Sequence, residues 1–247
     1  MYIVRSLRLY IEKPLDEGFK VLLKDDSFHY LSKVLKAKVN QEVVLFNNTG
    51  YDFFGYIKDI AAKHFEIYIE RKVFFEKEVF NTELAFSLCK NPCSDLIIKK
   101  LTELGVTSLQ PLISKNSIFN HKKLDFEKKF NHWKSISISS CEQSERSYLP
   151  DIKKIISFQD YIKNCKSEKK IILDTKSKDM INNLYNKPFC STSILVGPEG
   201  DFSQDEYLYA KQSNFSSVSL GDNILRVETA AIAAISYIKI INSSKNL

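Results

Sequence analysis

Two loops in the C-terminal part of the chain combine residue types that can bind a ligand and act on it. The first is Gly197-Pro198-Glu199-Gly200, which follows the apolar run 193–196. Its glycines leave the backbone amides open to a flat ligand, because no Cβ obstructs the approach; a plain tight turn between strand and helix is the alternative. The second loop ends in Arg226, which could stabilise negative charge on a substrate or simply pair with Glu228 or another carboxylate.

Short apolar strands precede both loops and helices follow them, and α/β proteins usually place ligands at such strand ends. After the first loop, Ser203 and Glu206 form a capping box, which predicts a helix that begins at Ser203. After the second loop, residues 227–235 are apolar nearly all round, so we expect this helix to be buried on every side, in the core or at a dimer contact. A third turn of this kind follows the apolar run 171–173.

These loops belong to a region in which apolar strands alternate with amphipathic helices. Strands are predicted at 84–89 and 106–113, and helices at 124–145 and at 95–104, where Gly105 closes the helix. This alternation is typical of an α/β domain with a mainly parallel sheet.

The N-terminal part instead has short strands separated by turn residues, which predicts a small β-barrel or sandwich. The runs 43–46 and 51–57 predict a hairpin, and 65–70 predicts a strand with one buried face. Segment 28–36 has the spacing of a helix, with Val34 among the residues that face inward. We therefore predict a small β-rich domain at residues 1–72, a linker at 73–82 and an α/β domain at 83–247.

The composition excludes several classes of protein. A net charge of +6 over 247 residues, 44% of them hydrophobic, excludes a disordered chain. No run approaches the roughly 18 apolar residues of a membrane helix, and arginines stand where a signal peptide is apolar, so we expect a cytosolic protein. Five cysteines and four scattered histidines fit reduced thiols and predict no metal site. The chain has no Gly-x-Gly-x-x-Gly or Gly-Lys-Ser/Thr motif, which disfavours a nucleotide-dependent oxidoreductase or NTPase.

Several motifs, taken in order, resemble the RsmE family of S-adenosylmethionine (SAM)-dependent 16S rRNA uracil-N3 methyltransferases. The most specific are the Gly-Pro-Glu-Gly loop at 197–200 and Leu-Gly-x-x-Ile-Leu-Arg-x-Glu-Thr-Ala at 220–230. The resemblance extends over nearly the whole chain through Thr102-Glu103-Leu104-Gly105-Val106, Cys141-Glu142-Gln143-Ser144-x-Arg146, and the N-terminal Arg5 with His29-Tyr30-Leu31-x-x-Val34-Leu35.

The resemblance implies a PUA-like β-barrel followed by a SPOUT methyltransferase domain, an α/β fold whose C-terminal part is tied in a trefoil knot. It also implies SAM as the cofactor and 16S rRNA or the small ribosomal subunit as the partner. Such proteins are similar in working as homodimers, with the C-terminal helix and the cofactor loops at the subunit contact.

The resemblance also assigns residues to roles. Three loops are expected to hold the cofactor, chiefly through backbone groups, and their residues are Leu173, Val196, Gly197, Pro198, Glu199, Gly200, Leu220, Gly221, Ile224, Leu225, Arg226 and Thr229. RNA-binding residues are expected in a local basic patch, for which solvated surface side chains are the alternative; they are Arg5, Arg8, Lys33, Lys36 and Arg146, with Lys38 beside them.

Methyl transfer to uracil N3 requires that nitrogen to lose its proton and to lie in line with the methyl group. We expect Arg226 to stabilise the anion that spreads onto O2 and O4 of the base. No histidine lies in the motif loops, so Glu199 or Glu228 is the expected proton acceptor. The target base must be unpaired or extruded, because a base inside a stack is not accessible.

Some positions depart from the family's pattern and keep other functions open. Asp201 and Glu145 stand where the family commonly shows glycine, Lys36 stands where it commonly shows arginine, and 90–95 has lost most of the family's charges. These changes keep a noncatalytic RNA-binding relative under consideration. A SPOUT ribose 2′-O-methyltransferase is the nearest rival enzyme, but it expects Ser-Leu-Asn where this chain has Val227-Glu228-Thr229, which favours base methylation.

Overall fold

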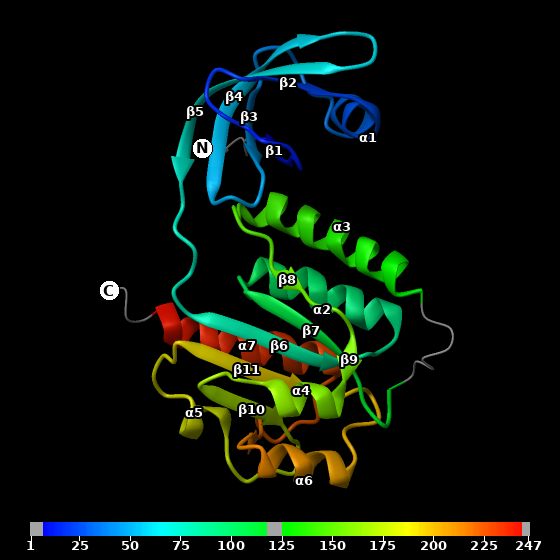
Figure 1. The fold of residues 1–247 in the computed structure, drawn as a ribbon, viewed down its shortest axis with the longest axis vertical. Helices are drawn as coiled ribbons and strands as arrows, with labels where there is room; N and C mark the ends of the chain where they lie inside the picture. The colour runs from blue at the N-terminus through cyan, green and yellow to red at the C-terminus, as the bar shows by residue number, and fades with distance from the viewer. Residues whose placement is uncertain (1–6, 118–124, 244–247) are drawn as a thin grey trace. The chain divides into compact units, whose positions relative to one another are not determined.

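A computed structural model describes residues 7–117 and 125–243, and these divide into two compact units (Figure 1). The first unit comprises the chain up to residue 77 together with residues 141–148. The second comprises residues 78–140 and the chain from residue 149 onward. Residues 141–148 therefore group with the first unit, although they lie in the range predicted for the second domain.

The first unit is built on a five-stranded sheet in the order β1-β3-β4-β5-β2, which curls and fits a half-barrel (Figure 1). The pair β1 and β3 is parallel and the other pairs are antiparallel. Its elements in chain order are β1 (Leu7–Tyr10), β2 (Lys20–Leu23), α1 (Asp25–His29), a π-helical turn (Tyr30–Val34), β3 (Glu42–Phe46), β4 (Tyr51–Ile60) and β5 (Phe65–Phe74).

The structure confirms the predicted hairpin, since β3 and β4 pair with Val43 opposite Gly55. It also confirms the strand that was predicted to have one buried face, because alternate residues of β5 from Phe65 to Ile69 are buried. The inward orientation predicted for Val34 is wrong, since its side chain is 65% exposed. Val34 ends the π-helical turn, whose wider turn carries more residues than an α-helical one and rotates this position away from the core.

The second unit is built on a parallel sheet in the order β12-β10-β11-β6-β7-β8, with β9 also paired to β7. The strands are β6 (Asn81–Ser87), β7 (Ser108–Ile113), β8 (Asp151–Ile152), β9 (Ile156–Ser157), β10 (Lys169–Leu173), β11 (Ser191–Val196) and β12 (Ser216–Val218). The helices are α2 (Asn91–Glu103), α3 (Phe126–Ser144), α4 (Phe158–Asn164), α5 (Ile181–Leu184), α6 (Gln204–Gln212) and α7 (Val227–Ser243).

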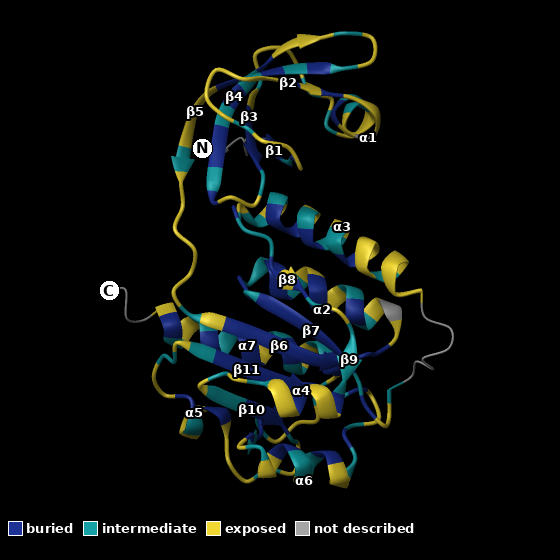
Figure 2. Cartoon of the chain, viewed as in Figure 1, coloured by how far each residue is buried: buried dark blue, intermediate teal, exposed yellow. Residues whose placement is uncertain are grey.

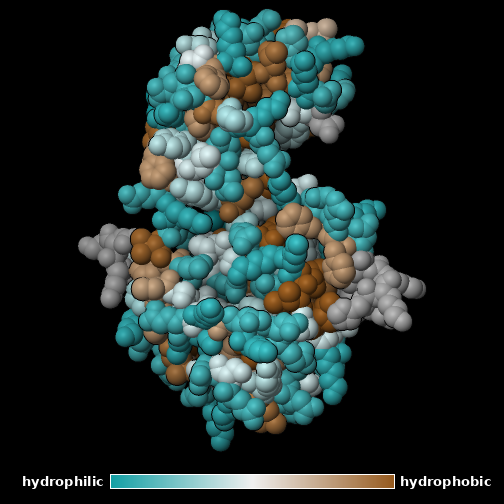
Figure 3. Space-filling model, viewed as in Figure 1, coloured by the Kyte–Doolittle hydropathy of each residue, from teal (hydrophilic) through white to brown (hydrophobic). Residues whose placement is uncertain are grey.

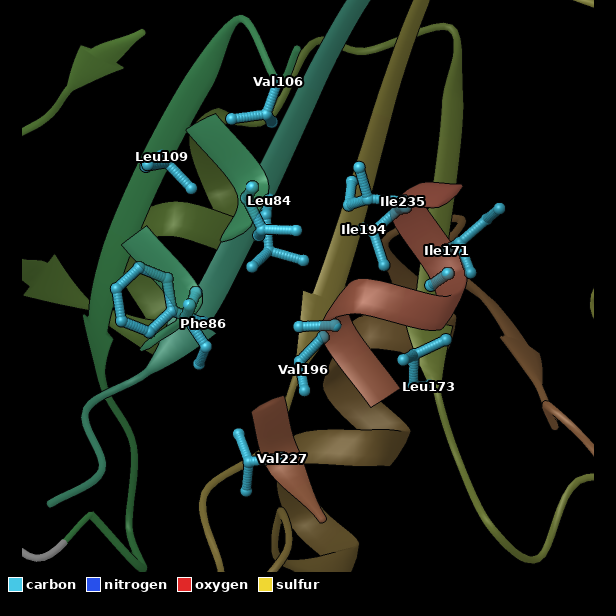
Figure 4. Close-up of a cluster of buried hydrophobic side chains, with 14 of the residues drawn as sticks. Leu84, Phe86, Val106, Leu109, Ile171, Leu173, Ile194, Val196, Val227 and Ile235 are labelled. Carbon is cyan, nitrogen blue, oxygen red and sulfur yellow. The ribbon is translucent and has the colours of Figure 1, made fainter. Parts of the chain in front are cut away.

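Helices cover both faces of this sheet, because successive residues of each buried strand point to opposite sides. In β6, Leu84 and Phe86 pack with α2 and α7, whereas Ala85 packs with α4 and α6. Strands β6, β7, β10 and β11 are buried along most of their length (Figure 2), whereas β9 and β12 are mostly half-buried. Figure 4 shows labelled side chains of β6, β7, β10 and β11 gathered around α7, with Val227 at its first turn.

Two helix predictions for this unit need correction. Helix α2 begins at Asn91 rather than Asp95, because Pro92 is tolerated in the first turn of a helix, where its missing N–H has no partner to lose. Within one chain, helix α7 buries only one side: Ala231 and Ala234 face the core, whereas Ala233 is exposed, so burial in the core on every side is wrong and burial at a dimer contact stays a prediction. One face of α7 is enough to cover the sheet, so packing within a single chain does not explain why its other face is also apolar.

On the face drawn in Figure 3, hydrophilic side chains predominate and hydrophobic residues form separate patches. No helix among the described residues is both long and apolar enough to cross a membrane.

Candidate functional site

A cavity lies in the second unit, at the carboxyl ends of β10, β11 and β12. We call it the strand-end cavity. Its volume is about 800 Å³, which is within the roughly 300–1,000 Å³ of small-molecule sites. Parallel strands end at the same edge of a sheet, and loops that leave this edge commonly form the binding site. The lining residues come from four segments: Lys90, Pro92, Cys93 and Leu96; Leu173, Asp174 and Thr175; Val196, Gly197, Pro198, Glu199 and Asp201; and Val218, Ser219, Leu220, Gly221, Asn223, Ile224, Leu225, Arg226, Val227, Glu228 and Ala230.

The loop after β11 supplies one wall of the strand-end cavity. Its turn is closed by a hydrogen bond from the Asp201 N–H to the Pro198 carbonyl at 2.9 Å. A Cβ at Gly197 would lie only 3.2 Å from the backbone nitrogen of Phe202, so this loop is packed tightly against its own continuation. The carboxylate of Glu199 accepts the backbone N–H of Lys90 at 3.3 Å and so joins this wall to the start of α2.

The capping box predicted after this loop is present and fixes where α6 starts. The Ser203 side chain accepts the Glu206 N–H, and the Glu206 carboxylate accepts the Ser203 N–H at 2.8 Å. Glu206 is buried and also accepts the N–H of Lys115 at 2.9 Å. The prediction of a helix start at Ser203 is therefore confirmed, with Ser203 as the capping residue.

The loop between β12 and α7 supplies the opposite wall. Arg226 lines the strand-end cavity with an exposed side chain, and its carbonyl accepts the N–H of Ala230 in the first turn of α7. Glu228 is half-buried and also lines the cavity. Ile224 is 87% exposed at the edge of the cavity, which is unusual for a large apolar side chain.

A thiol completes the wall formed by α2. Cys93 lines the strand-end cavity, and Cys89 lies buried behind it. A hydrogen bond with Cys89, burial and the negative charge of Glu228 raise the pKa of the Cys93 thiol. The thiol therefore stays protonated at neutral pH and presents a neutral, weakly polar surface to a ligand.

The structure brings together most of the residues that the sequence assigned to a cofactor. Gly200 and Thr229 are the two that do not line the strand-end cavity: the Gly200 carbonyl accepts the side-chain amide of Asn116 at 3.1 Å, and Thr229 is exposed on α7. The other assigned residues line it, namely Leu173, Val196, Gly197, Pro198, Glu199, Leu220, Gly221, Ile224, Leu225 and Arg226.

The residues assigned to RNA binding differ in how far they are exposed in the first unit. Arg5 lies outside the described residues. Lys33 and Lys36 are exposed, as is Lys38. Arg146 is half-buried, and its carbonyl accepts a guanidinium N–H of Arg8 at 3.0 Å.

The RNA role predicted for Arg8 needs correction. Its side chain is buried, and its guanidinium donates to both oxygens of Asp52, at 2.5 and 2.8 Å. Ser147 donates to the same carboxylate at 2.7 Å. A buried, doubly hydrogen-bonded guanidinium holds the first unit together and is not available to a phosphate.

The sequence assigned the turn after β10 to the cofactor but named only Leu173 there; Asp174 and Thr175, which follow directly, also line the strand-end cavity. Sequence reasoning missed the lining residues of one further segment. Lys90 and Cys93 come from the start of α2, far from the other loops in the sequence, and no local pattern indicates their position. Among the described residues, no group of three or more His, Cys, Asp or Glu side chains is arranged to hold a metal ion.

A doubly wound α/β unit with a cavity at its strand ends, preceded by a small curled sheet, defines the class of RNA methyltransferases with a PUA domain. Residues 76–239 match the family model of an RNA methyltransferase domain, and residues 23–70 match that of an RNA methyltransferase PUA domain. The chain belongs to the ribosomal RNA small subunit methyltransferase E family, the RsmE family.

Relatives and solved structures agree with this membership. Ribosomal RNA small subunit methyltransferase E of Buchnera aphidicola subsp. Acyrthosiphon pisum is 34% identical over 94% of this chain and 92% of its own length. The protein of the same name from Rickettsia conorii is 34% identical over 96% of both chains. A Legionella pneumophila structure solved with its bound cofactor SAM has a TM-score of 0.89 and 26% identity, over 96% of this chain and 98% of its own. The Neisseria gonorrhoeae ribosomal RNA small subunit methyltransferase E bound to SAM has a TM-score of 0.87 and 29% identity, with the same coverage.

Proposed function

We propose that the protein transfers a methyl group from SAM to N3 of a uridine in 16S rRNA of the small ribosomal subunit. The observation that carries this proposal is the strand-end cavity, which has the size of a small-molecule site and is lined by the loops that bear the family motifs. Two similar structures are described as bound to SAM, which supports the choice of cofactor. We also propose that the reaction takes place in the cytosol, since its proposed substrate is ribosomal RNA.

The walls of the strand-end cavity fit a cationic, partly apolar cofactor. Leu173, Val196 and Leu225 supply apolar contact, and the backbone around Gly197 is open for hydrogen bonds. Asp174 and Glu228 supply negative charge. SAM, when bound, supplies an electrophilic methyl group on a sulfonium centre.

The protein's own residues must then activate and hold the uracil. Arg226 reaches the strand-end cavity with a fixed positive charge, and we assign it to the negative charge that develops on O2 and O4 as N3 loses its proton. Both candidate proton acceptors line the cavity and both have a partner: Glu199 accepts the Lys90 amide, and Glu228 interacts with the Cys93 thiol. We propose Glu228 as the acceptor, because it is two residues from Arg226 in the sequence.

We further propose that the first unit holds the RNA. Lys33, Lys36 and Lys38 are exposed on and just after the π-helical turn, where they can neutralise phosphates. Lys36 itself has a backbone φ of 48°, in the left-handed region. We also propose the trefoil knot that the resemblance implies; the TM-score of 0.89 to the Legionella structure supports it.

Transfer of labelled methyl from SAM to small ribosomal subunits that lack the modification tests the proposed reaction. Digestion of the RNA and nucleoside analysis should place the label in 3-methyluridine, and subunits that already carry the modification should take up none. Label in a ribose 2′-O-methyl nucleoside would contradict the proposal and favour the rival SPOUT class. Binding of SAM without any transfer would favour the noncatalytic relative.

A homodimer is part of the same proposal. Ile240 on α7 and Ile224 beside the strand-end cavity are large apolar side chains left in solvent by a single chain, as is Leu96, which is 37% exposed. A second copy would bury them and explain why the outer face of α7 is apolar. Light scattering should give twice the 28.5 kDa of one chain. Ile240→Asp should shift the protein toward monomer, whereas Leu208→Asp, an exposed position on α6, should not.

A further inference from the structure

Asp201 occupies a backbone conformation that favours glycine. Its φ is 60°, in the left-handed region where a Cβ crowds the following carbonyl. It directly follows the Gly-Pro-Glu-Gly loop and lines the strand-end cavity. A non-glycine residue persists in this conformation only when its surroundings hold it there.

The side chain of Asp201 is held by two hydrogen bonds. Its Oδ1 accepts the backbone N–H of Phe202 at 2.8 Å and the hydroxyl of Tyr207 at 2.6 Å. The second bond joins a hydroxyl to a carboxylate and is short, which is typical of a charge-assisted hydrogen bond. These two hydrogen bonds hold the Asp201 side chain in place and stabilise a backbone conformation that glycine would adopt without strain.

Tyr207 connects this anchor to a second wall of the strand-end cavity. Its hydroxyl also lies 3.2 Å from the carbonyl oxygen of Leu173, the last residue of β10. The Tyr207 ring packs edge-on against the buried Phe202, with centroids 5.8 Å apart at 86°. Burial and the hydrogen bond to Asp201 raise the pKa of Tyr207, so the hydroxyl remains a donor throughout the physiological range.

Other contacts brace the same loop from its outer side. Asn116 donates its side-chain amide to the carbonyls of Gly200 at 3.1 Å and Asp201 at 2.9 Å. These bonds fix the loop against the segment after β7 but do not reach β10. The Tyr207 hydroxyl has a single proton, which it shares between two acceptors, the Asp201 carboxylate of the loop at 2.6 Å and the Leu173 carbonyl at the strand end at 3.2 Å.

We infer that Tyr207 is a positioning residue for the cofactor: through Asp201 and the Leu173 carbonyl it sets the spacing between two walls of the strand-end cavity. The inference rests on the proposed function, since it takes SAM to be the ligand of this cavity. Tyr207 itself does not line the cavity, so it acts through Asp201 and Leu173 and not by contact with the ligand.

The variant Tyr207→Phe keeps the ring and removes only the hydroxyl. It should raise the Kd for SAM, measured by titration calorimetry, by about ten- to a hundredfold, the usual effect of losing a hydrogen bond to a charged group. The value of kcat at saturating SAM should stay within about twofold, because Arg226 and Glu228 are untouched. Tyr209→Phe on the same helix is the matched control and should leave both values unchanged.

A second comparison, made in the Asp201→Gly variant, separates this positioning role from a general effect of Tyr207 on packing. In the Asp201→Gly variant the carboxylate partner is gone, so adding Tyr207→Phe should change the Kd by less than about twofold. Equal losses in both backgrounds would overturn the inference, as would an unchanged Kd in the single variant. If the unaltered protein bound no SAM, the proposed function would fail instead, which keeps the two failures distinguishable.

Discussion

Two residues that depart from the family's pattern turn out to share one backbone conformation. Asp201 and Glu145 stand where the family commonly shows glycine, and both have a φ of 60°. Each position therefore has the left-handed backbone conformation that glycine adopts most readily, although neither residue is a glycine. The substitutions no longer indicate a decayed enzyme, because each one occupies the glycine-like conformation that its position requires.

Glu145 closes helix α3 in a Schellman motif, in which the N–H of Arg146 bonds to the carbonyl of Cys141 at 3.1 Å. Glu145→Gly should therefore raise the free energy of unfolding by about 1 kcal/mol, because glycine adopts this conformation without a Cβ clash. Scanning calorimetry should show a higher midpoint. Ser139→Gly in the exposed interior of the same helix should lower it by a similar amount; equal midpoints for the two variants would refute the argument.

The proposed chemistry depends most on Arg226. If it stabilises the developing anion, Arg226→Ala should lower kcat by about a hundredfold or more and change the Kd for SAM by less than about threefold. Arg226→Lys should recover part of the rate, since lysine restores the positive charge but lacks the planar guanidinium that donates two parallel hydrogen bonds. Single-turnover methylation and calorimetry measure the two quantities separately, and parallel losses in both would assign Arg226 to cofactor binding alone.

At the scale of elements, Arg8 is a basic residue whose contacts stabilise the fold and leave it unavailable to the substrate. It links β1 to Asp52 on β4 and to Ser147 in the segment that follows α3. Arg8→Ala should destabilise the protein by about 3–5 kcal/mol, because it leaves a buried carboxylate unpaired. Urea unfolding followed by circular dichroism measures this change.

Lys36→Ala is the control for that experiment, because Lys36 is exposed. It should change the stability by less than about 0.5 kcal/mol and should weaken RNA binding instead. A small loss of stability in Arg8→Ala, combined with a large loss of RNA affinity, would return Arg8 to the RNA-binding residues.

Elements with strong local signals were predictable from the sequence. The capping box at Ser203 and Glu206 predicted the start of α6, and the turn at 47–50 predicted the hairpin of β3 and β4, because both depend on residues close together in the chain. The π-helical turn and the exposed face of α7 were not predictable, since tertiary packing decides them. The grouping of 141–148 with the first unit likewise depends on contacts such as that between Glu142 and the Tyr10 N–H, which are distant in sequence.

For the whole molecule, the contrast between local signals and tertiary packing also explains which parts of the strand-end cavity could be predicted from the sequence. The loops after β10, β11 and β12 could be assigned in advance because parallel strands present their carboxyl ends at one edge. The wall formed by Lys90 and Cys93 could not, because it depends on β6 lying next to β11 in the sheet. A strand order that departs from chain order brings these distant segments to one cavity.

This arrangement predicts a ligand effect confined to one unit. SAM at about a hundred times its Kd should stabilise the conformation that binds it by about 2.7 kcal/mol. Hydrogen exchange should slow in the segments 173–175, 196–201 and 218–228, which supply most of the cavity lining, and should be unchanged in β3, β4 and β5. The first unit has its own hydrophobic core, so ligand binding at the second unit's strand ends does not alter the local opening of its sheet. Equal slowing in both units would show that they open together and that the cofactor controls the RNA-binding unit as well.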